Sequence, residues 1–273
     1  MPQDAPLIDV LAFAGVGVER WVAADTATRV LLAGVDWTVR AGEHWIVLGP
    51  NGAGKTTLMN LAAAVSQPST GTVHVLGRQL GRTDVRTLRE HVGLVDARIA
   101  RALKPGLTGL QVVLTGATGT IALLRNRLSP ADEARAADML ALVGGAPLAG
   151  RRFEDCSQGE RQRLLIARSL MPDPELLLLD EPMTGLDLPS RERLIGAVVA
   201  LARRSPRLPT VTVTHHLEEI PPVASHALLL RGGRAVAVGP IAEVLTSERV
   251  SDCFDVAVSV TVRDGRWSAA VHT

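Results

Sequence analysis

A glycine-rich segment, GPNGAGKTT at positions 49–57, constrains the fold more than any other part of this sequence. It satisfies the pattern G-x-x-x-x-G-K-[ST]. The apolar run HWIVLG at 44–49 predicts a short buried strand before the turn, and TTLMNLAAAV at 56–65 predicts a helix after it. A tight glycine turn between a buried strand and a helix is typical of a sheet with helices packed on its faces.

This loop has the chemistry to hold a chain of phosphates. Glycines let backbone N–H groups wrap a phosphate, Lys55 would reach the β- and γ-phosphates, and the Thr56 hydroxyl would hold Mg²⁺. An ordinary glycine-rich turn is the alternative, but Lys55 is one of only two lysines among 273 residues. We therefore predict a nucleotide-binding loop made of Gly49, Pro50, Asn51, Gly52, Ala53, Gly54, Lys55, Thr56 and Thr57.

Two carboxylates follow the leucine run of LLLLDEP at 176–182. Four consecutive leucines predict a strand buried on both faces. Asp180 would end this strand and lie near Mg²⁺, because parallel sheets place their ligands at the carboxyl ends of strands. Glu181 would then polarise a water molecule against the γ-phosphate as a general base.

Strands and helices alternate along most of the chain, whereas the middle is rich in Ala, Leu and Arg. There, Ser129 and Pro130 predict the start of a helix. We predict one domain over 1–273 with a helical lobe at about 98–172. A C-terminal hairpin extension is predicted at about 250–273, where valines alternate around Asp264-Gly265.

Composition excludes several classes of protein. The net charge of +1 gives no electrostatic case for nucleic acid as a partner. Two cysteines without a C-x-x-C spacing predict neither a disulfide scaffold nor a zinc site. No window approaches the roughly 20 apolar residues that cross a bilayer, and no secretory signal is visible. We expect a soluble chain whose membrane role, if any, comes through a partner.

Together these motifs resemble those of the ATP-binding cassette (ABC) family of ATPases, from about Leu31 to Gly239. GPNGAGKTT is similar to the Walker A loop and LLLLDEP to Walker B with its catalytic glutamate. TGLD at 184–187 resembles the D-loop, and His215 the switch histidine. CSQGERQR at 156–163 occupies the place of the signature motif, usually LSGGQ. The resemblance implies an α/β P-loop fold with a mixed central sheet, an antiparallel β subdomain and an inserted helical lobe.

The same resemblance implies a mechanism in which two cassettes face each other head to tail and enclose two ATP molecules. His215 would contact the γ-phosphate in its own subunit, and Asp187 would couple the two sites. The signature residues would meet the γ-phosphate of the ATP bound by the partner; they are Ser157, Gln158, Gly159 and Glu160.

The signature departs from the family pattern at two positions. Gln158 replaces the first glycine, and its side chain would narrow the approach of the backbone. Glu160 replaces the terminal glutamine. With Ser157 as N-cap and Glu160 three residues later, this stretch also predicts a capping box at the start of a helix.

Two further family features are absent. The Q-loop glutamine should follow the strand at 92–95, but the next glutamine, Gln111, lies too far on, inside an expected helix. The chain has no tyrosine to stack the adenine. Trp21 could replace it, and a half-buried surface aromatic is an equal alternative.

Several other residues have structural explanations. We expect Cys156, Trp37 and Trp45 in the core. The arginines of RQRLLIAR at 161–168 are expected on a solvated helix face. His215 and His216 are not expected to bind a metal, because adjacent side chains at a strand end point apart and no Cys or acidic residue lies at ligand spacing.

The function predicted from these features is that of an ATP-binding, ATP-hydrolysing, Mg²⁺-dependent cassette that drives a separate membrane permease. The expected partners are a second cassette, in a homodimer, and the permease; no nucleic acid is expected. The chain would then lie in the cytoplasm, peripheral on the inner face of the membrane. One alternative is a soluble ABC-type ATPase with a regulatory or mechanical role on nucleic acid or the ribosome, and another is an ATP-binding switch that does not turn over.

Overall fold

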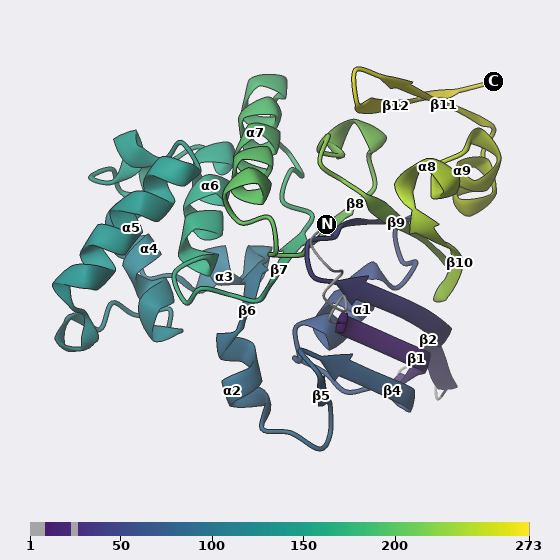
Figure 1. The fold of residues 1–273 in the computed structure, drawn as a ribbon, viewed down its shortest axis with the longest axis horizontal. Helices are drawn as coiled ribbons and strands as arrows, with labels where there is room; N and C mark the ends of the chain where they lie inside the picture. The colour runs from purple at the N-terminus through teal and green to yellow at the C-terminus, as the bar shows by residue number, and fades with distance from the viewer. Residues whose placement is uncertain (1–8, 23–26, 273) are drawn as a thin grey trace, which may run out of the picture. The chain divides into compact units, whose positions relative to one another are not determined.

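The computed structural model describes residues 9–22 and 27–272, and these divide into two compact units. The first runs up to Arg89 and resumes at Arg207, and the second runs from Glu90 to Pro206 (Figure 1). The helical lobe predicted at about 98–172 falls within the second unit. The single-domain organisation of 1–273 stays a prediction.

An antiparallel sheet forms one part of the first unit. Its strands lie in the order β2-β1-β4-β5. They are β1 (Asp9–Val22), β2 (Ala27–Arg40), β4 (Thr70–Val75) and β5 (Arg78–Gln79). The sequence did not indicate β1, because Gly15 and Gly17 interrupt its alternation. The pairing of β1 with β2 shifts register between Phe13 and Val16, and Gly15 has a φ of 57°. This strand is therefore bent by bulges rather than regular.

A second sheet in the same unit is mixed, with strand order β10-β9-β3-β8. Its strands are β3 (His44–Leu48), β8 (Thr210–Thr214), β9 (His226–Arg231) and β10 (Arg234–Pro240). β3 runs parallel to β8 and β9, and β10 returns antiparallel to β9. Helix α1 (Lys55–Ala62) follows β3 at the predicted position. The predicted fold class, α/β with a mixed sheet and an antiparallel β part, is confirmed.

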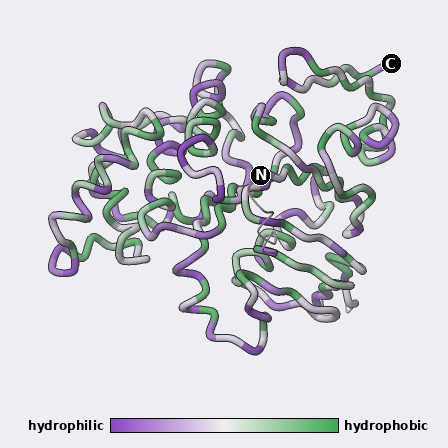
Figure 2. The backbone as a smooth tube through the Cα atoms, viewed as in Figure 1, coloured by the Kyte–Doolittle hydropathy of each residue, from purple (hydrophilic) through white to green (hydrophobic). Residues whose placement is uncertain are grey.

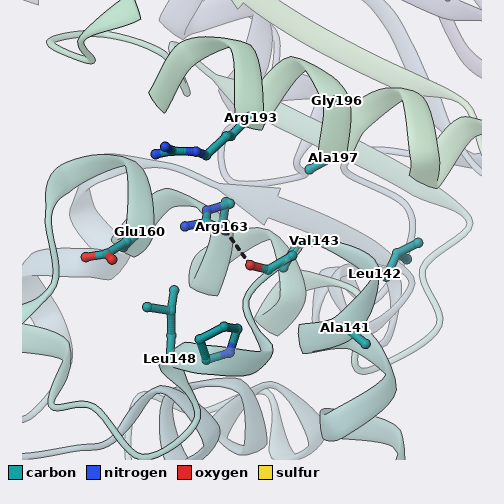
Figure 3. A pocket seen from close by; sticks show the side chains of 11 residues that line it. Ala141, Leu142, Val143, Leu148, Glu160, Arg163, Arg193, Gly196 and Ala197 are labelled. Carbon is teal, nitrogen blue, oxygen red and sulfur yellow. Dashed lines mark hydrogen bonds between the residues drawn. The ribbon is translucent and has the colours of Figure 1, made fainter. Parts of the chain in front are cut away.

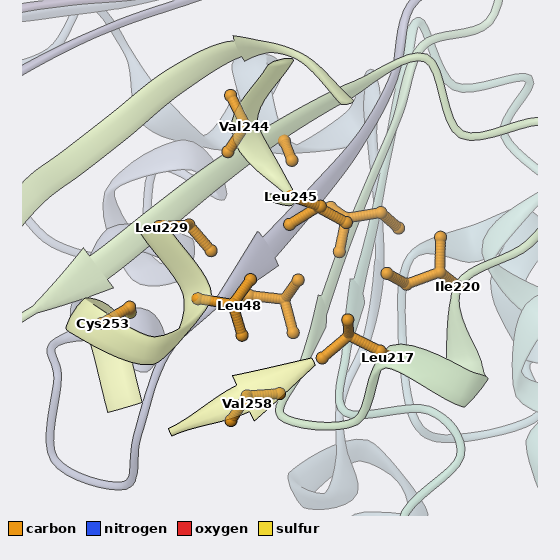
Figure 4. Packing of buried hydrophobic residues seen from close by; sticks show 11 residues of the cluster. Leu48, Leu217, Ile220, Leu229, Val244, Leu245, Cys253 and Val258 are labelled. Carbon is orange, nitrogen blue, oxygen red and sulfur yellow. The ribbon is translucent and has the colours of Figure 1, made fainter. Parts of the chain in front are cut away.

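The C-terminal segment packs on the mixed sheet. It consists of α8 (Ile241–Val244), α9 (Ser247–Phe254), β11 (Val258–Arg263) and β12 (Arg266–Val271). Val244, Cys253 and Val258 share a core cluster with Leu48 and Leu229 of the sheet (Figure 4). Asp264-Gly265 forms the hydrophilic turn of the hairpin (Figure 2). The hairpin starts at Val258, and α9 occupies residues expected to belong to the extension.

The second unit contains a parallel pair of strands and a group of helices. β6 (Val92–Val95) pairs with β7 (Leu176–Asp180), whose four leucines are fully buried as predicted. The helices are α3 (Ala97–Ala102), α4 (Gly109–Leu114), α5 (Pro130–Leu142), α6 (Gln158–Ser169) and α7 (Leu188–Arg204). Helix α2 (Val85–Glu90) spans the division between the units.

Sequence signals locate several of these helices correctly. Ser129 caps α5 and closes a capping box with Asp132, with Pro130 in the first turn. Gln111 lies inside α4 and closes the capping box of Thr108, so it is helical as predicted. Trp37 and Trp45 are buried in the core, as expected.

The prediction for the arginines of α6 is wrong. Arg168 is half-buried and donates to the Thr115 hydroxyl at 2.9 Å and to the Thr120 carbonyl at 2.9 Å. Burial lowers the pKa of this guanidinium. Arg161 donates to the Phe153 carbonyl at 3.0 Å. These arginines tie the helix to neighbouring loops, because those loops carry backbone oxygens that need donors.

Within the described residues, the structure contains no helix of the length and apolarity needed to span a membrane.

Candidate functional site

The glycine-rich loop adopts the strand–turn–helix arrangement that its sequence predicts. Gly49 has no room for a side chain, since a Cβ there would lie 2.0 Å from the Leu230 carbonyl oxygen. Gly54 has a φ of 105°, in the left-handed region, and serves as the N-cap of α1. Lys55 is buried, and its Nζ donates to the carbonyls of Gly49 at 2.7 Å and Pro50 at 3.0 Å. The loop therefore curls around its own lysine.

The Gly232-Gly233 turn between β9 and β10 supports this loop. From the sequence, this turn was predicted only as the connection between two strands. Gly233 lies between β9 and β10, and its N–H donates to the Ala53 carbonyl at 2.9 Å. Its own carbonyl accepts from the N–H of Ala33 in β2 at 2.8 Å. A Cβ at Gly233, whose φ is 78°, would lie 2.7 Å from the Leu31 carbonyl oxygen. The only signal in the sequence was the Gly232-Gly233 pair itself.

The residues present fit a phosphate chain. The loop offers glycine backbone with positive φ at Gly52 and Gly54, a buried ammonium on Lys55 and an exposed hydroxyl residue, Thr56, in the first turn of an eight-residue helix. Backbone N–H groups at a helix N-terminus together with a fixed cation form an anion-binding site. Thr56 supplies a hard oxygen donor of the kind that Mg²⁺ prefers.

His215 follows β8 in a loop that buried polar groups hold in place. The Thr214 hydroxyl donates to the Glu219 carboxylate, and the N–H of His216 donates to that hydroxyl at 3.0 Å. Thr214 and Glu219 are both buried. The hydrogen bond gives the buried carboxylate the partner that burial requires. The sequence alone does not identify Glu219 as a functional residue. The only signal for it in the sequence is the acidic pair Glu218-Glu219.

The expectation that His215 and His216 point apart is wrong. Their ring centroids lie 4.1 Å apart at 44°. Both residues follow β8, so the alternation of side chains along a strand no longer applies. No cluster of three or more potential metal-ligating His, Cys, Asp or Glu residues occurs in the part of the chain that the structure describes.

Asp180 and Glu181 lie at the carboxyl end of β7, as predicted. Asp180 is half-buried, and Glu181 comes directly after the strand. Glu181 has a φ of 47°, which is costly for a residue with a side chain. The hydroxyl of Thr184 donates to its Oε2 at 3.3 Å, and the N–H of Thr184 donates to its carbonyl at 3.3 Å. The candidate general base is therefore held by the turn that follows it.

Where the family places its Q-loop glutamine, this chain carries a charged pair. Asp96 follows β6 and is buried, and its Oδ1 accepts the N–H groups of Arg98 at 2.7 Å and Ile99 at 3.1 Å to cap α3. Its Oδ2 accepts from the Arg98 guanidinium at 2.7 Å and 2.9 Å. The hydrogen bond to Asp96 raises the pKa of Arg98, and the charges of Asp96 and Asp180 raise it further.

The signature stretch forms the predicted capping box. Ser157 caps α6, accepting from the N–H of Glu160 at 3.3 Å, and the N–H of Ser157 donates to Glu160 Oε2 at 2.8 Å. That backbone hydrogen bond lowers the pKa of Glu160, and the Arg151 guanidinium, 3.2 Å away, favours the same charged form. Cys156 before the cap is buried as expected, and burial raises its pKa.

The two other signature residues contact the segment that resembles the D-loop. Gln158 Nε2 donates to the Thr184 carbonyl at 2.6 Å. A Cβ at Gly159 would lie 2.7 Å from the Cβ of Ser190, so a side chain does not fit there. Asp187 caps α7 by accepting from the N–H of Ser190 at 2.9 Å, and hydrogen bonds from Ser190 lower its pKa. The second unit thus brings Glu181, the signature residues and Asp187 into one cluster.

A recess of about 670 Å³ lies beside the signature helix, lined by residues of α5, α6 and α7 (Figure 3). Glu160 and Leu148 line it, and Arg163 donates to the Gly144 carbonyl at 2.5 Å. Desolvation lowers the pKa of Arg163. Arg163 therefore anchors α6 to the turn that follows α5.

Trp21 lies near the end of β1 with 62% of its surface exposed. Of the two alternatives for this residue, the half-buried aromatic does not fit this exposure, and the stacking role stays a prediction. Its ring is accessible for stacking.

This geometry defines the class of protein. A glycine loop curled around a buried lysine, between a parallel strand and a helix, is the architecture of a P-loop nucleotide-binding domain. Within that class, the family model described as "ABC transporter" matches residues 32–184. The chain belongs to the ABC transporter family of ATP-binding proteins.

Known relatives are similar over most of their length. The chain is 41% identical to the ABC transporter ATP-binding protein YlmA of Bacillus subtilis, over 84% of this chain and 87% of that protein. It is 39% identical to a putative ABC transporter ATP-binding protein of Streptococcus mutans, over 87% and 91%. Among solved structures, the dimeric ATP-binding cassette MJ0796 bound to ADP and phosphate matches with a TM-score of 0.72 at 23% identity, over 85% of this chain and 98% of that one.

Substitution of Gly233 by alanine will distort the glycine-rich loop. We expect Gly233→Ala to lower the free energy of unfolding by at least about 2 kcal/mol, because it combines a positive φ with a clash against backbone. Gly232→Ala is the matched control, since Gly232 has a φ of 55° but nothing within 4 Å of its added Cβ. Thermal denaturation and titration with a fluorescent ATP analogue measure both effects. Equal losses in the two variants would contradict the supporting role of Gly233.

The capping box of α6 will make stability depend on pH. The lowered pKa of Glu160 means that its contribution is present above the pKa of an unfolded glutamate and is lost as the pH falls through the folded value. Glu160→Gln keeps a capping residue that does not titrate. We therefore expect wild type to exceed this variant in stability at pH 7 and to lose that advantage as the pH falls through the folded pKa of Glu160. Urea unfolding at a series of pH values from neutral to acid measures the difference, and a gap that stays constant would refute the prediction.

Proposed function

We propose that this chain binds ATP with Mg²⁺, hydrolyses it, and drives a separate membrane permease through nucleotide-dependent pairing of two cassettes. The observation that carries the proposal is the glycine-rich loop closed around Lys55. Membership of the ABC transporter family supports the link to transport.

The phosphate chain of ATP would lie in the loop formed by residues 49–57. Backbone N–H groups and the Lys55 ammonium would bind the phosphate oxygens. These oxygens would take the place of the Gly49 and Pro50 carbonyls as hydrogen-bond acceptors of the lysine. Thr56 and Asp180 would hold Mg²⁺ through oxygen atoms. A bound Mg²⁺ would neutralise negative charge on the phosphates. The exposed ring of Trp21 would stack on the adenine.

Glu181 would act as the general base on the attacking water. Its carboxylate is held by the Thr184 hydroxyl and its backbone by the Thr184 N–H, so its orientation is set before substrate arrives. His215 would bind the γ-phosphate as a hydrogen-bond donor. The buried Thr214–Glu219 pair would fix the loop that presents it.

A second copy of this chain would complete each site. The capped N-terminus of α6 would present the Ser157 hydroxyl and backbone N–H groups to the ATP of the partner. Gly159 has no side chain, which allows the start of α6 to pack against Ser190. Glu160 would act mainly through its capping box, because a carboxylate facing a phosphate is repelled. Asp187 would couple the two sites. The dimeric cassette bound to ADP and phosphate supports this pairing.

The proposed location is the cytoplasmic face of the membrane, where the chain would be held peripherally by its permease. No helix of the described residues is suited to span the bilayer, so the path for the cargo would belong to the partner. The names of the relatives, which are those of transporter ATP-binding proteins, support this arrangement.

Replacement of the catalytic carboxylate tests the hydrolytic step. We expect Glu181→Gln to reduce ATP turnover at least about 100-fold, because an amide cannot accept the proton of the attacking water. Binding of ATP should persist, since the glycine-rich loop is unchanged. Phosphate release and equilibrium binding of an ATP analogue measure the two quantities. Glu175→Gln, which alters an exposed glutamate before β7, is the matched control. Unchanged turnover in Glu181→Gln would remove the proposed base.

Isolation from native membranes tests the partner. We expect the tagged chain to co-purify in detergent with a multi-spanning membrane protein, because the cassette has no span of its own among its described residues. Mass spectrometry of the purified complex identifies the partner. Association with ribosomes or DNA at moderate salt, with no membrane protein, would contradict the transport proposal and favour the soluble ATPase.

A further inference from the structure

Gln158 occupies the first position of α6, where the family pattern has glycine. Its side chain is exposed but is engaged within its own subunit, as Nε2 donates to the Thr184 carbonyl at 2.6 Å. The facing residue, Gly185, leaves room for the amide. A Cβ at Gly185 would already lie 3.2 Å from both polar atoms of the Gln158 side chain. Where a glycine would have no side chain, Gln158 therefore adds a hydrogen-bond donor that points to the Thr184 carbonyl.

The same Thr184 contacts the proposed general base. Its hydroxyl donates to Glu181 Oε2 at 3.3 Å, and its N–H donates to the Glu181 carbonyl at 3.3 Å. Glu181 needs such contacts because its φ of 47° is unfavourable for a residue with a side chain. Two hydrogen bonds thus run in series from the start of the signature helix to the catalytic carboxylate.

Helix α6 provides a firm base for this series. Arg161 donates to the Phe153 and Glu154 carbonyls, Arg163 donates to the Gly144 carbonyl, and Gly159 packs against Ser190. With the helix fixed in this way, the Gln158 amide holds the Thr184 carbonyl at a defined place. The Thr184 side chain is then directed to Glu181.

We propose that Gln158 is a positioning residue that holds Glu181 through Thr184, linking the signature helix to the general base within one subunit. This inference rests on the proposed ATPase function. Gln158 therefore has a function that the glycine of the family pattern cannot provide. Replacing Gln158 by glycine will lower the rate of ATP hydrolysis. An alternative role, direct contact with the ATP of the partner, would act on substrate binding instead.

Steady-state ATP hydrolysis separates these roles. We expect Gln158→Gly and Thr184→Val each to lower kcat roughly 3- to 10-fold, as the loss of one hydrogen bond in the series would, with KM for ATP unchanged. Thr184→Ser keeps the hydroxyl, so its kcat should lie near that of wild type and above that of Thr184→Val. The double variant Gln158→Gly/Thr184→Val should lose little more than either single variant, because both act on the same carboxylate. Melting temperatures show whether each variant is folded.

Other results would overturn the proposal in distinct ways. A raised KM with unchanged kcat in Gln158→Gly would assign the residue to ATP binding. Losses that multiply in the double variant would make the two residues independent, and an impaired Thr184→Ser would make the effect one of packing. If Gln158→Gly does not fold, the comparison of Thr184→Val with Thr184→Ser decides whether the hydroxyl acts on kcat. Wild type without ATP turnover would overturn the proposed function and this role together, whereas active wild type with indifferent variants would overturn this role alone.

Discussion

The glycine-rich loop of the first unit depends on the hydrogen bonds that the buried ammonium of Lys55 donates. A cation taken out of water must be satisfied by the protein, and the Gly49 and Pro50 carbonyls meet that need at 2.7 and 3.0 Å. These two bonds close the loop, and Gly233 holds it from outside through Ala53. The lysine therefore stabilises the conformation of its own loop. In the proposed function, a phosphate chain would carry more negative charge than two carbonyl dipoles and would compete for the N–H groups of the Lys55 ammonium.

In the second unit, the groups that need hydrogen-bond partners are the backbone N–H groups at the starts of helices. Three of its helices begin with an acidic or hydroxyl cap close to proposed functional residues: Asp96 for α3, Ser157 for α6 and Asp187 for α7. Each cap satisfies backbone N–H groups that would otherwise lack partners, and each fixes where its helix starts. The cap at Ser157 thus serves both structure and the proposed site, because the residues of the capping box, Ser157 and Glu160, belong to the surface proposed to face a partner.

Local patterns in the sequence predicted what local physics decides. The strand–turn–helix of residues 44–62, the buried leucines of β7, the helix start at Ser129 and the capping box of Ser157 each depend on residues within a few positions of one another. The features that were missed depend on distant ones. The bonds of Arg168 reach Thr115 and Thr120, about 50 positions away, and Gln158 reaches Thr184, 26 positions away. A sequence pattern records that an arginine or glutamine is present but not which carbonyl will accept its proton. Strand β1 was missed for a different reason, since its glycines and bulges break the alternation by which a strand is predicted.

The departures from the family pattern fall on groups that connect parts of the proposed site, while the loop proposed to hold phosphate follows the pattern completely. Where the pattern has a neutral Q-loop glutamine, Asp96 and Arg98 form a charged pair at the end of β6. Where it has a signature glycine, Gln158 adds a donor toward Thr184. In this chain both positions carry side chains with defined hydrogen-bond partners. An amide can exchange partners at little cost, but the buried carboxylate of Asp96, which accepts two backbone N–H groups and a guanidinium, can release them only by losing the cap of α3. Any displacement of the Asp96 side chain would therefore also disturb the start of α3.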